Sequence, residues 1–262
     1  MTNVSEDVPP SVDSPRRSLR CLNLACGTRM HSDWINADFS QYAKLAKHPR
    51  LARFLYFIRL LSADRYRRLQ SVDPNILCIN LLKGLPFPSD HFDVVYHSHF
   101  LEHLDRSAVP NFLTECRRVL KPGGVLRISL PDLHKLASWY LASNSRLCKE
   151  TSPAEMESHL RHIDALFDQM VREETSGASN QTAIVRWIER ILGHSAKNMG
   201  ELHKWMYDYY SLKAVLEKVG FHSVNEHSAT TSAVPDWSRF DLDTNPDGSV
   251  YKPESLFVEA LK

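Results

Sequence analysis

The chain has 262 residues, of which 43% are hydrophobic and 24% are charged, with a formal net charge of +1. These proportions are typical of a globular protein with one large domain, and they exclude fibrous and wholly disordered classes. The five cysteines are widely spaced and odd in number, so we expect neither a disulfide framework nor a structural zinc site. Residues 1–18 contain no apolar signal core, and we expect them to form a disordered tail on a cytoplasmic protein.

Short apolar runs alternate with amphipathic segments in the first half of the chain. The runs predict strands over 18–26, 34–39, 75–81, 93–100 and 125–130. Helical periodicity predicts helices over 44–69 and 105–120, and the sequence Lys-Pro-Gly-Gly at 121–124 stops the second. This alternation indicates an α/β fold with a parallel sheet and helices on both faces.

The alternation lapses after residue 131. Helices are expected over 133–147, 154–174, 182–192 and 211–219, followed by strands over 222–228 and 255–261. The first three helices form an insertion of about 133–200 after the fifth strand, in the position of a lid. Aromatic residues flank it and predict either walls of an acceptor site or an apolar seam: Trp139, Tyr140, Trp205, Tyr207, Tyr209 and Tyr210.

The segment 44–68 holds eight Lys or Arg residues and a single acid, Asp64. Its apolar stripe consists of Leu51, Phe54, Leu55, Ile58 and Leu61. These features predict an interfacial helix that contacts an anionic membrane or captures an anionic acceptor. They equally fit a helix packed on its own sheet with solvated arginines. We expect no specific nucleic-acid partner, because the rest of the chain is acidic and carries no RNA-recognition motif.

Polar and small residues stand where the predicted strands end, which is the edge where open parallel sheets bind ligands. They are Gly27 after the first strand, Asp38 after the second, Asn80 after the third, and the histidine-rich stretch 97–103 after the fourth. A carboxylate can accept from both hydroxyls of a ribose, and an amide can pair with an adenine edge. Together these positions predict a nucleoside site.

Several stretches resemble class I S-adenosylmethionine-dependent methyltransferases, in particular a small-molecule and glycan group with LNLxCG and WxNxD motifs. They are LNLACG, DWINAD, FDVVY, LEHL, LKPGG, HKWMYDYY and SLFVEALK. The resemblance implies a methyltransferase domain over 19–262 with a doubly wound, mostly parallel seven-stranded sheet. The implied strand order is 3-2-1-4-5-7-6, with an antiparallel last strand and S-adenosyl-L-methionine bound across strands one, two and four.

Residue by residue, the resemblance implies that Ala25, Cys26 and Gly27 form the loop beneath the cofactor, and that Asp38 holds the ribose hydroxyls. Ala25 departs from the glycine that is usual in the family.

The resemblance further implies that Asn80 and Leu81 contact the adenine, and that Ser98 and His99 lie near the sulfur. Asn80 departs from the usual aspartate. We expect a working enzyme despite both departures.

His103 matches a position where related sugar methyltransferases carry a general base, and Asp132 is placed to orient it or to bind a substrate hydroxyl. The alternative for His103 is a structural residue held by Glu102 or by the backbone. We expect no metal site, because His159 and His162 share a helix face without a third ligand at a defined spacing.

The expected function is methyl transfer to a small-molecule or sugar acceptor, at a hydroxyl. Two alternatives stay open: methylation at nitrogen or carbon, and a cofactor-fold binding protein without turnover. Acceptor identity and oligomeric state are not predicted.

Overall fold

A seven-stranded sheet forms the centre of the computed structural model, which describes residues 19–148, 152–169 and 203–262. The strands are β1 Cys21–Leu24, β2 Trp34–Asp38, β3 Leu77–Cys78, β4 Phe92–Ser98, β5 Leu120–Pro131, β6 His222–His227 and β7 Ser255–Leu261. Their order is β3-β2-β1-β4-β5-β7-β6, and β7 is antiparallel to both of its neighbours. The predicted fold class and strand order are confirmed.

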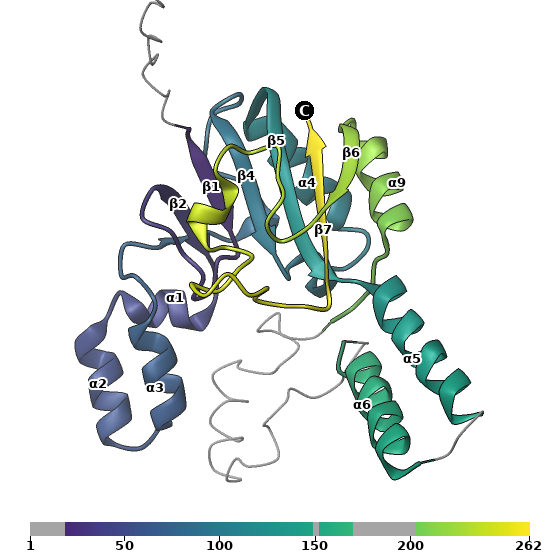
Figure 1. The fold of residues 1–262 in the computed structure, drawn as a ribbon. Coiled ribbons are helices and arrows are strands. Elements are labelled where there is room, and N and C mark those ends of the chain that lie inside the picture. The colour runs from purple at the N-terminus through teal and green to yellow at the C-terminus, as the bar shows by residue number, and fades with distance from the viewer. Residues whose placement is uncertain (1–18, 149–151, 170–202) are drawn as a thin grey trace, which may run out of the picture.

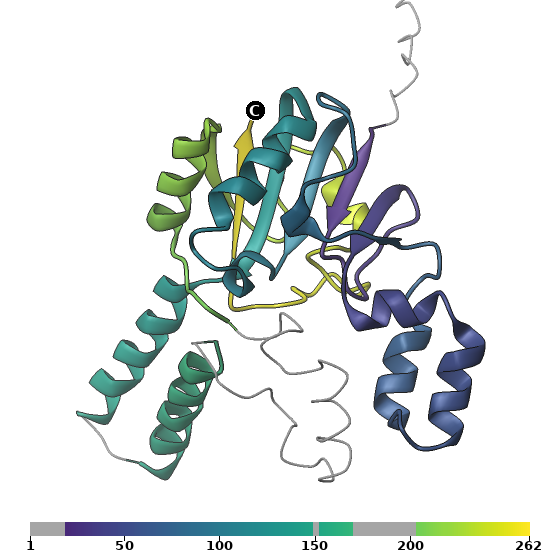
Figure 2. The same cartoon turned by 180° about the vertical axis from the view of Figure 1, so that it is seen from behind.

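The helices are placed unevenly around the sheet (Figure 1). They are α1 Gln41–Ala46, α2 Pro49–Phe57, α3 Ala63–Gln70, α4 Val109–Val119, α5 Leu133–Leu147, α6 Pro153–Gln169 and α9 Tyr209–Val219, with short 3-10 turns η1 Leu81–Lys83, η2 Leu101–His103 and η4 Trp237–Phe240. Helices α4 and α9 cover one face of the sheet, as the reverse view shows (Figure 2). The helices predicted over 105–120 and 211–219 correspond to α4 and α9. The strand predicted over 75–81 is shorter in the structure, where it consists of β3 alone.

The opposite face differs from the expectation of helices on both sides. The irregular connection between β6 and β7, including η4, packs Trp237, Phe240 and Leu242 against Trp34 and Tyr96 of the sheet. Arg127 in β5 is fully buried and anchors this connection through Asp243 and β7 through Glu259, with N–O distances of 2.8 and 2.7 Å. A buried guanidinium needs such partners, because an unpaired charge in the core is costly.

The predicted single helix 44–69 is wrong: the segment folds into three helices. Pro49 starts α2 at its first turn, α2 ends at Phe57, and Ser62 caps α3 by accepting from the Arg65 amide. Arg59 has a left-handed φ of 59° between the two helices. Helices α2 and α3 therefore form a hairpin, and Tyr56 stacks on Tyr66 with ring centroids 4.5 Å apart.

Two helical pairs project from the carboxyl-end edge of the sheet, α2–α3 on one side and α5–α6 on the other (Figure 1). Helix α5 has the predicted bounds, and α6 begins one residue before its prediction. His159 accepts or donates a 2.8 Å hydrogen bond with Ser143 of α5, so this histidine fastens the pair. The predicted helix 182–192, with most of the lid region beyond α6, lies outside the described residues. None of the described helices is both long and apolar enough to cross a membrane.

Candidate active site

The loop after β1 makes a tight left-handed turn. Ala25 and Gly27 have φ values of 51° and 53°, and the Arg29 amide donates to the Cys26 carbonyl at 2.8 Å. A Cβ built at Gly27 would meet no atom within 4 Å, so open space lies beside the loop. The Cys26 thiol points into a separate apolar cluster, and burial raises its pKa. The loop thus offers main chain, rather than a thiolate, to a ligand.

Asp38 ends β2 beside this loop. Its side chain is buried, and its two oxygens accept from the main-chain amides of Gly27, at 2.8 Å, and of Ser40. Because each carboxylate oxygen has two lone pairs, both can still accept a hydroxyl donor from a ligand. The parallel register of β1 and β2 brings Asp38 to the loop, since Leu24 pairs with Ala37.

Asn80 and Leu81 follow β3 as the sequence predicts, with different consequences for a ligand. The Asn80 Oδ1 atom accepts from the Leu82 amide at 3.1 Å and caps η1, which leaves its Nδ2 group as the donor. The Leu81 side chain is buried in the main core, so a ligand would meet only its main chain.

His99 links the end of β4 to two other elements. Its Nε2 atom lies 2.8 Å from the Ser255 hydroxyl of β7, and its Nδ1 atom lies 3.2 Å from Glu102 Oε1. Its φ of 49° is left-handed, and its amide donates to Ser129 of β5 at 2.8 Å. Burial lowers the pKa of His99. These contacts fix the position of the His99 side chain at the edge of the candidate site. Ser98 ends β4 and pairs with Ser129 of β5.

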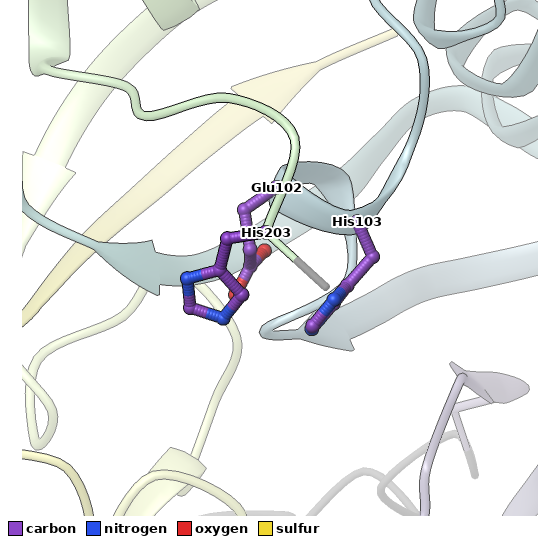
Figure 3. A group of neighbouring side chains, drawn as sticks. All are labelled: Glu102, His103 and His203. Carbon is purple, nitrogen blue, oxygen red and sulfur yellow. The ribbon is translucent and has the colours of Figure 1, made fainter. Parts of the chain in front are cut away.

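Glu102, His103 and His203 gather where η2 meets the connection that precedes α9 (Figure 3). The His103 and His203 rings meet edge to face, with centroids 4.7 Å apart. His203 Nδ1 donates to the Gln169 carbonyl at 2.8 Å, which leaves Nε2 as its acceptor when the ring is neutral. The Lys204 and Trp205 amides both donate to the Glu102 carbonyl and hold His203 in place.

The carboxylate of Glu102 is fully buried beneath these rings. Burial raises its pKa, but the imidazoles of His99, His103 and His203 outweigh burial and hold that pKa at about 2. Neither oxygen makes a well-directed hydrogen bond within the described residues, although His99 lies at ion-pair distance. An ionised carboxylate in this position favours a proton on a neighbouring imidazole.

The same three residues offer one ligand atom each, all within 4.8 Å of one another. Two imidazoles and a carboxylate are a donor set that suits zinc and similar divalent ions. The sequence did not indicate this set because His203 lies a hundred residues from His103. Its one signal was that His203 begins the stretch HKWMYDYY, which carries part of the family resemblance.

Asp132 has a defined structural role. Its Oδ1 atom accepts from the His134 amide at 2.9 Å and caps α5, and its own amide donates to the Glu254 carbonyl at 2.9 Å. Its action on His103 stays a prediction.

Defined packing contacts or hydrogen bonds are made by three of the six predicted aromatic residues, Tyr140, Tyr207 and Tyr209. Tyr207 is buried in the core, Tyr209 donates to the Val224 carbonyl at 2.9 Å, and Tyr140 packs on His159. Trp205 is exposed, with Arg106 stacked 4.0 Å over its ring.

Comparison with known proteins supports the resemblance to methyltransferases. Residues 22–128 match the family model described as a methyltransferase domain. Over 48 residues the chain is 48% identical to "Probable methyltransferase ltbC" of Aspergillus luteorubrus, covering 18% of this chain and 17% of that protein. Over 51 residues it is 45% identical to a "Probable S-adenosylmethionine-dependent methyltransferase" of Mycolicibacterium smegmatis. This match covers 20% of this chain and 19% of that protein. The matched part spans less than a fifth of the length of these curated relatives.

A solved S-adenosylmethionine-dependent methyltransferase from Mesorhizobium loti aligns with a TM-score of 0.41 and 17% identity, over 94% of this chain and 91% of that chain. The family match covers the part of the sheet from β1 into β5. The strand order of the whole sheet is the order that the resemblance implies, and the cofactor implied with it is S-adenosyl-L-methionine.

The residues at the strand ends fit this cofactor. The open space at Gly27 admits a ligand against the main chain, Asp38 retains lone pairs for ribose hydroxyls, and Asn80 presents a donor for the adenine.

Proposed function

We propose that this chain transfers a methyl group from S-adenosyl-L-methionine to a hydroxyl of a small-molecule or sugar acceptor. The observation that supports a hydroxyl acceptor is the group formed by Glu102, His103 and His203 just beyond the end of β4. The cofactor supplies a methyl carbon already activated by its bond to a sulfonium. A neutral hydroxyl that attacks this carbon must lose its proton during or just after the transfer.

His103 is the proton acceptor in this proposal. An imidazole takes up a proton near neutral pH, and the buried, ionised Glu102 stabilises the imidazolium that results. His203 packs against the His103 ring and restricts its orientation. A ring nitrogen of His103 would take the proton of the acceptor hydroxyl. Bound S-adenosyl-L-methionine would supply the methyl group to the hydroxyl oxygen and leave as S-adenosylhomocysteine.

A screen of acceptors with isotope-labelled cofactor tests the proposal. The panel contains sugars, phenols, amines and acidic carbon compounds, and mass spectrometry detects the methylated product. Label transferred to oxygen in a hydroxyl compound supports the proposal. Label found only on nitrogen or carbon would replace hydroxyl transfer with one of those reactions. Tight cofactor binding without formation of S-adenosylhomocysteine with any acceptor would favour a binding protein without turnover.

A further inference from the structure

The hairpin of α2 and α3 exposes six large apolar side chains, all in α2 and the turn that follows it. Phe57, the last residue of α2, is 83% exposed, and Phe54 is 57% exposed. Leu51, Tyr56, Ile58 and Leu60 are exposed as well. Single exposed apolar residues are ordinary, but six within ten residues form a patch that favours contact with another surface.

Positive charge surrounds this patch. Arg50, Arg53 and Arg59 are exposed among the apolar residues, and Arg67 and Arg68 are exposed on α3. The only acid between residues 44 and 68, Asp64, is paired with Arg67. The partner of this surface must therefore supply both an apolar phase and negative charge.

We propose that the α2–α3 hairpin docks on an anionic lipid surface. The turn at residues 58–62 enters the boundary between headgroups and acyl chains, and the arginines pair with lipid phosphates. A nucleic acid would satisfy the arginines but not the apolar tip. A second copy of the hairpin would bring two strongly positive segments together.

Docking would also orient the methyltransferase site. The hairpin projects from the carboxyl-end edge of the sheet, the edge that carries Gly27, Asp38 and the His103 group (Figure 1). The tip lies at the end of the hairpin far from the sheet, so the site faces the lipid. The acceptor is then an amphiphilic or lipid-linked hydroxyl compound, and this last step rests on the proposed function, whereas docking does not.

Vesicle flotation with the full chain tests the docking. Vesicles of phosphatidylcholine alone are compared with vesicles that contain phosphatidylglycerol at about three parts in ten, at low and high salt. We expect binding to the anionic vesicles that weakens with salt. The double variant Phe57→Ser/Ile58→Ser, at unchanged charge, and the double variant Arg50→Glu/Arg53→Glu should each lower partitioning by about tenfold or more.

Helix α6 provides a matched control. It exposes Leu160, at 52%, and Phe167, at 61%, beside acidic residues such as Glu157 and Asp164. Leu160→Ser/Phe167→Ser should leave vesicle binding unchanged. Circular dichroism and calorimetric titration with the cofactor, performed on every variant, report folding and the methyltransferase site separately from docking.

Several outcomes would overturn the proposal. One is an absence of binding to anionic vesicles at low salt, and another is equal binding to both kinds of vesicle. Hairpin-dependent binding to a short nucleic-acid duplex without vesicle binding would assign the surface to nucleic acid. Self-association that the Phe57→Ser/Ile58→Ser variant abolishes, again without vesicle binding, would assign it to a second copy of the chain.

Discussion

The Asp38 carboxylate accepts a hydrogen bond from the Gly27 amide at 2.8 Å, and this bond ties the end of β2 to the loop after β1. We therefore expect Asp38→Ala to lose both a ribose-binding group and the support of the cofactor loop. Cofactor affinity should fall by about 1–3 kcal/mol, as for the loss of a charge-assisted hydrogen bond. Isothermal titration with S-adenosyl-L-methionine and S-adenosylhomocysteine measures the change.

Asp33→Asn is the control for this measurement. Asp33 is exposed just before β2, and its substitution removes the same charge as Asp38→Ala. Asp38→Asn should fall between the parent and Asp38→Ala, since the amide keeps one acceptor oxygen but presents NH₂ where the second oxygen was. Parent-like affinity in both Asp38 variants would refute the placement of the ribose.

His103→Ala should reduce turnover by about 10²–10⁴ while cofactor affinity stays within about twofold, because a lost general base affects the chemical step. Steady-state kinetics with an acceptor from the labelled screen measures turnover. His222→Ala, at the exposed start of β6, is the matched control. Unchanged turnover at saturating acceptor would return His103 to a structural role.

The meeting of Gly27 and Asp38 could be predicted from sequence because it depends on a regular feature of the fold. Parallel strands end at one edge, so Gly27 and Asp38 meet although eleven residues separate them. His203 could not be placed in this way. His203 follows His103 by a hundred positions in the chain, and a single sequence shows no periodicity across such a distance.

The error over 44–69 has a similar local cause. The apolar periodicity runs through residue 61, but Ser62 caps a new helix and Arg59 adopts a left-handed conformation. Both break the helix without interrupting the hydrophobic pattern. The irregular cover over the second face of the sheet was also missed, because it depends on the buried ion pairs of Arg127 rather than on helical repeats.

Ala25→Gly should stabilise the protein. Ala25 has a φ of 51°, a left-handed conformation that costs an L-residue with a Cβ about 1–2 kcal/mol, partly offset by the greater unfolded entropy of glycine. We expect a net gain of about 1 kcal/mol in the free energy of unfolding, measured by urea denaturation, and cofactor affinity at least equal to the parent. Ala142→Gly, on the exposed side of α5, should instead lose about 1 kcal/mol. A loss of stability in both variants would show that the loop is not strained at Ala25.

His97 makes folding stability dependent on pH. Its side chain is fully buried in β4 between Phe100 and Phe112, and neither ring nitrogen has a hydrogen-bond partner within the described residues. Burial lowers the pKa of His97 from 6.5 to about 4, against an opposing effect of Glu102. Between these two pH values the unfolded chain binds a proton that the folded chain excludes. The free energy of unfolding therefore includes the full contribution of the neutral His97 ring above pH 6.5. This contribution, about 3 kcal/mol in total, is lost as the pH falls from 6.5 toward 4.

Urea denaturation at pH 7 and pH 5 tests this dependence in the parent and in His97→Leu. The leucine variant should lose about 2 kcal/mol less than the parent between these pH values, because its side chain cannot be protonated in the unfolded state. At pH 7 it should be close to the parent in stability, since an apolar side chain replaces an unsatisfied polar one. His222→Leu, at an exposed position, should keep the parent's pH dependence. If His97→Leu and the parent lose the same stability on acidification, His97 is either protonated in the folded protein or accessible to water.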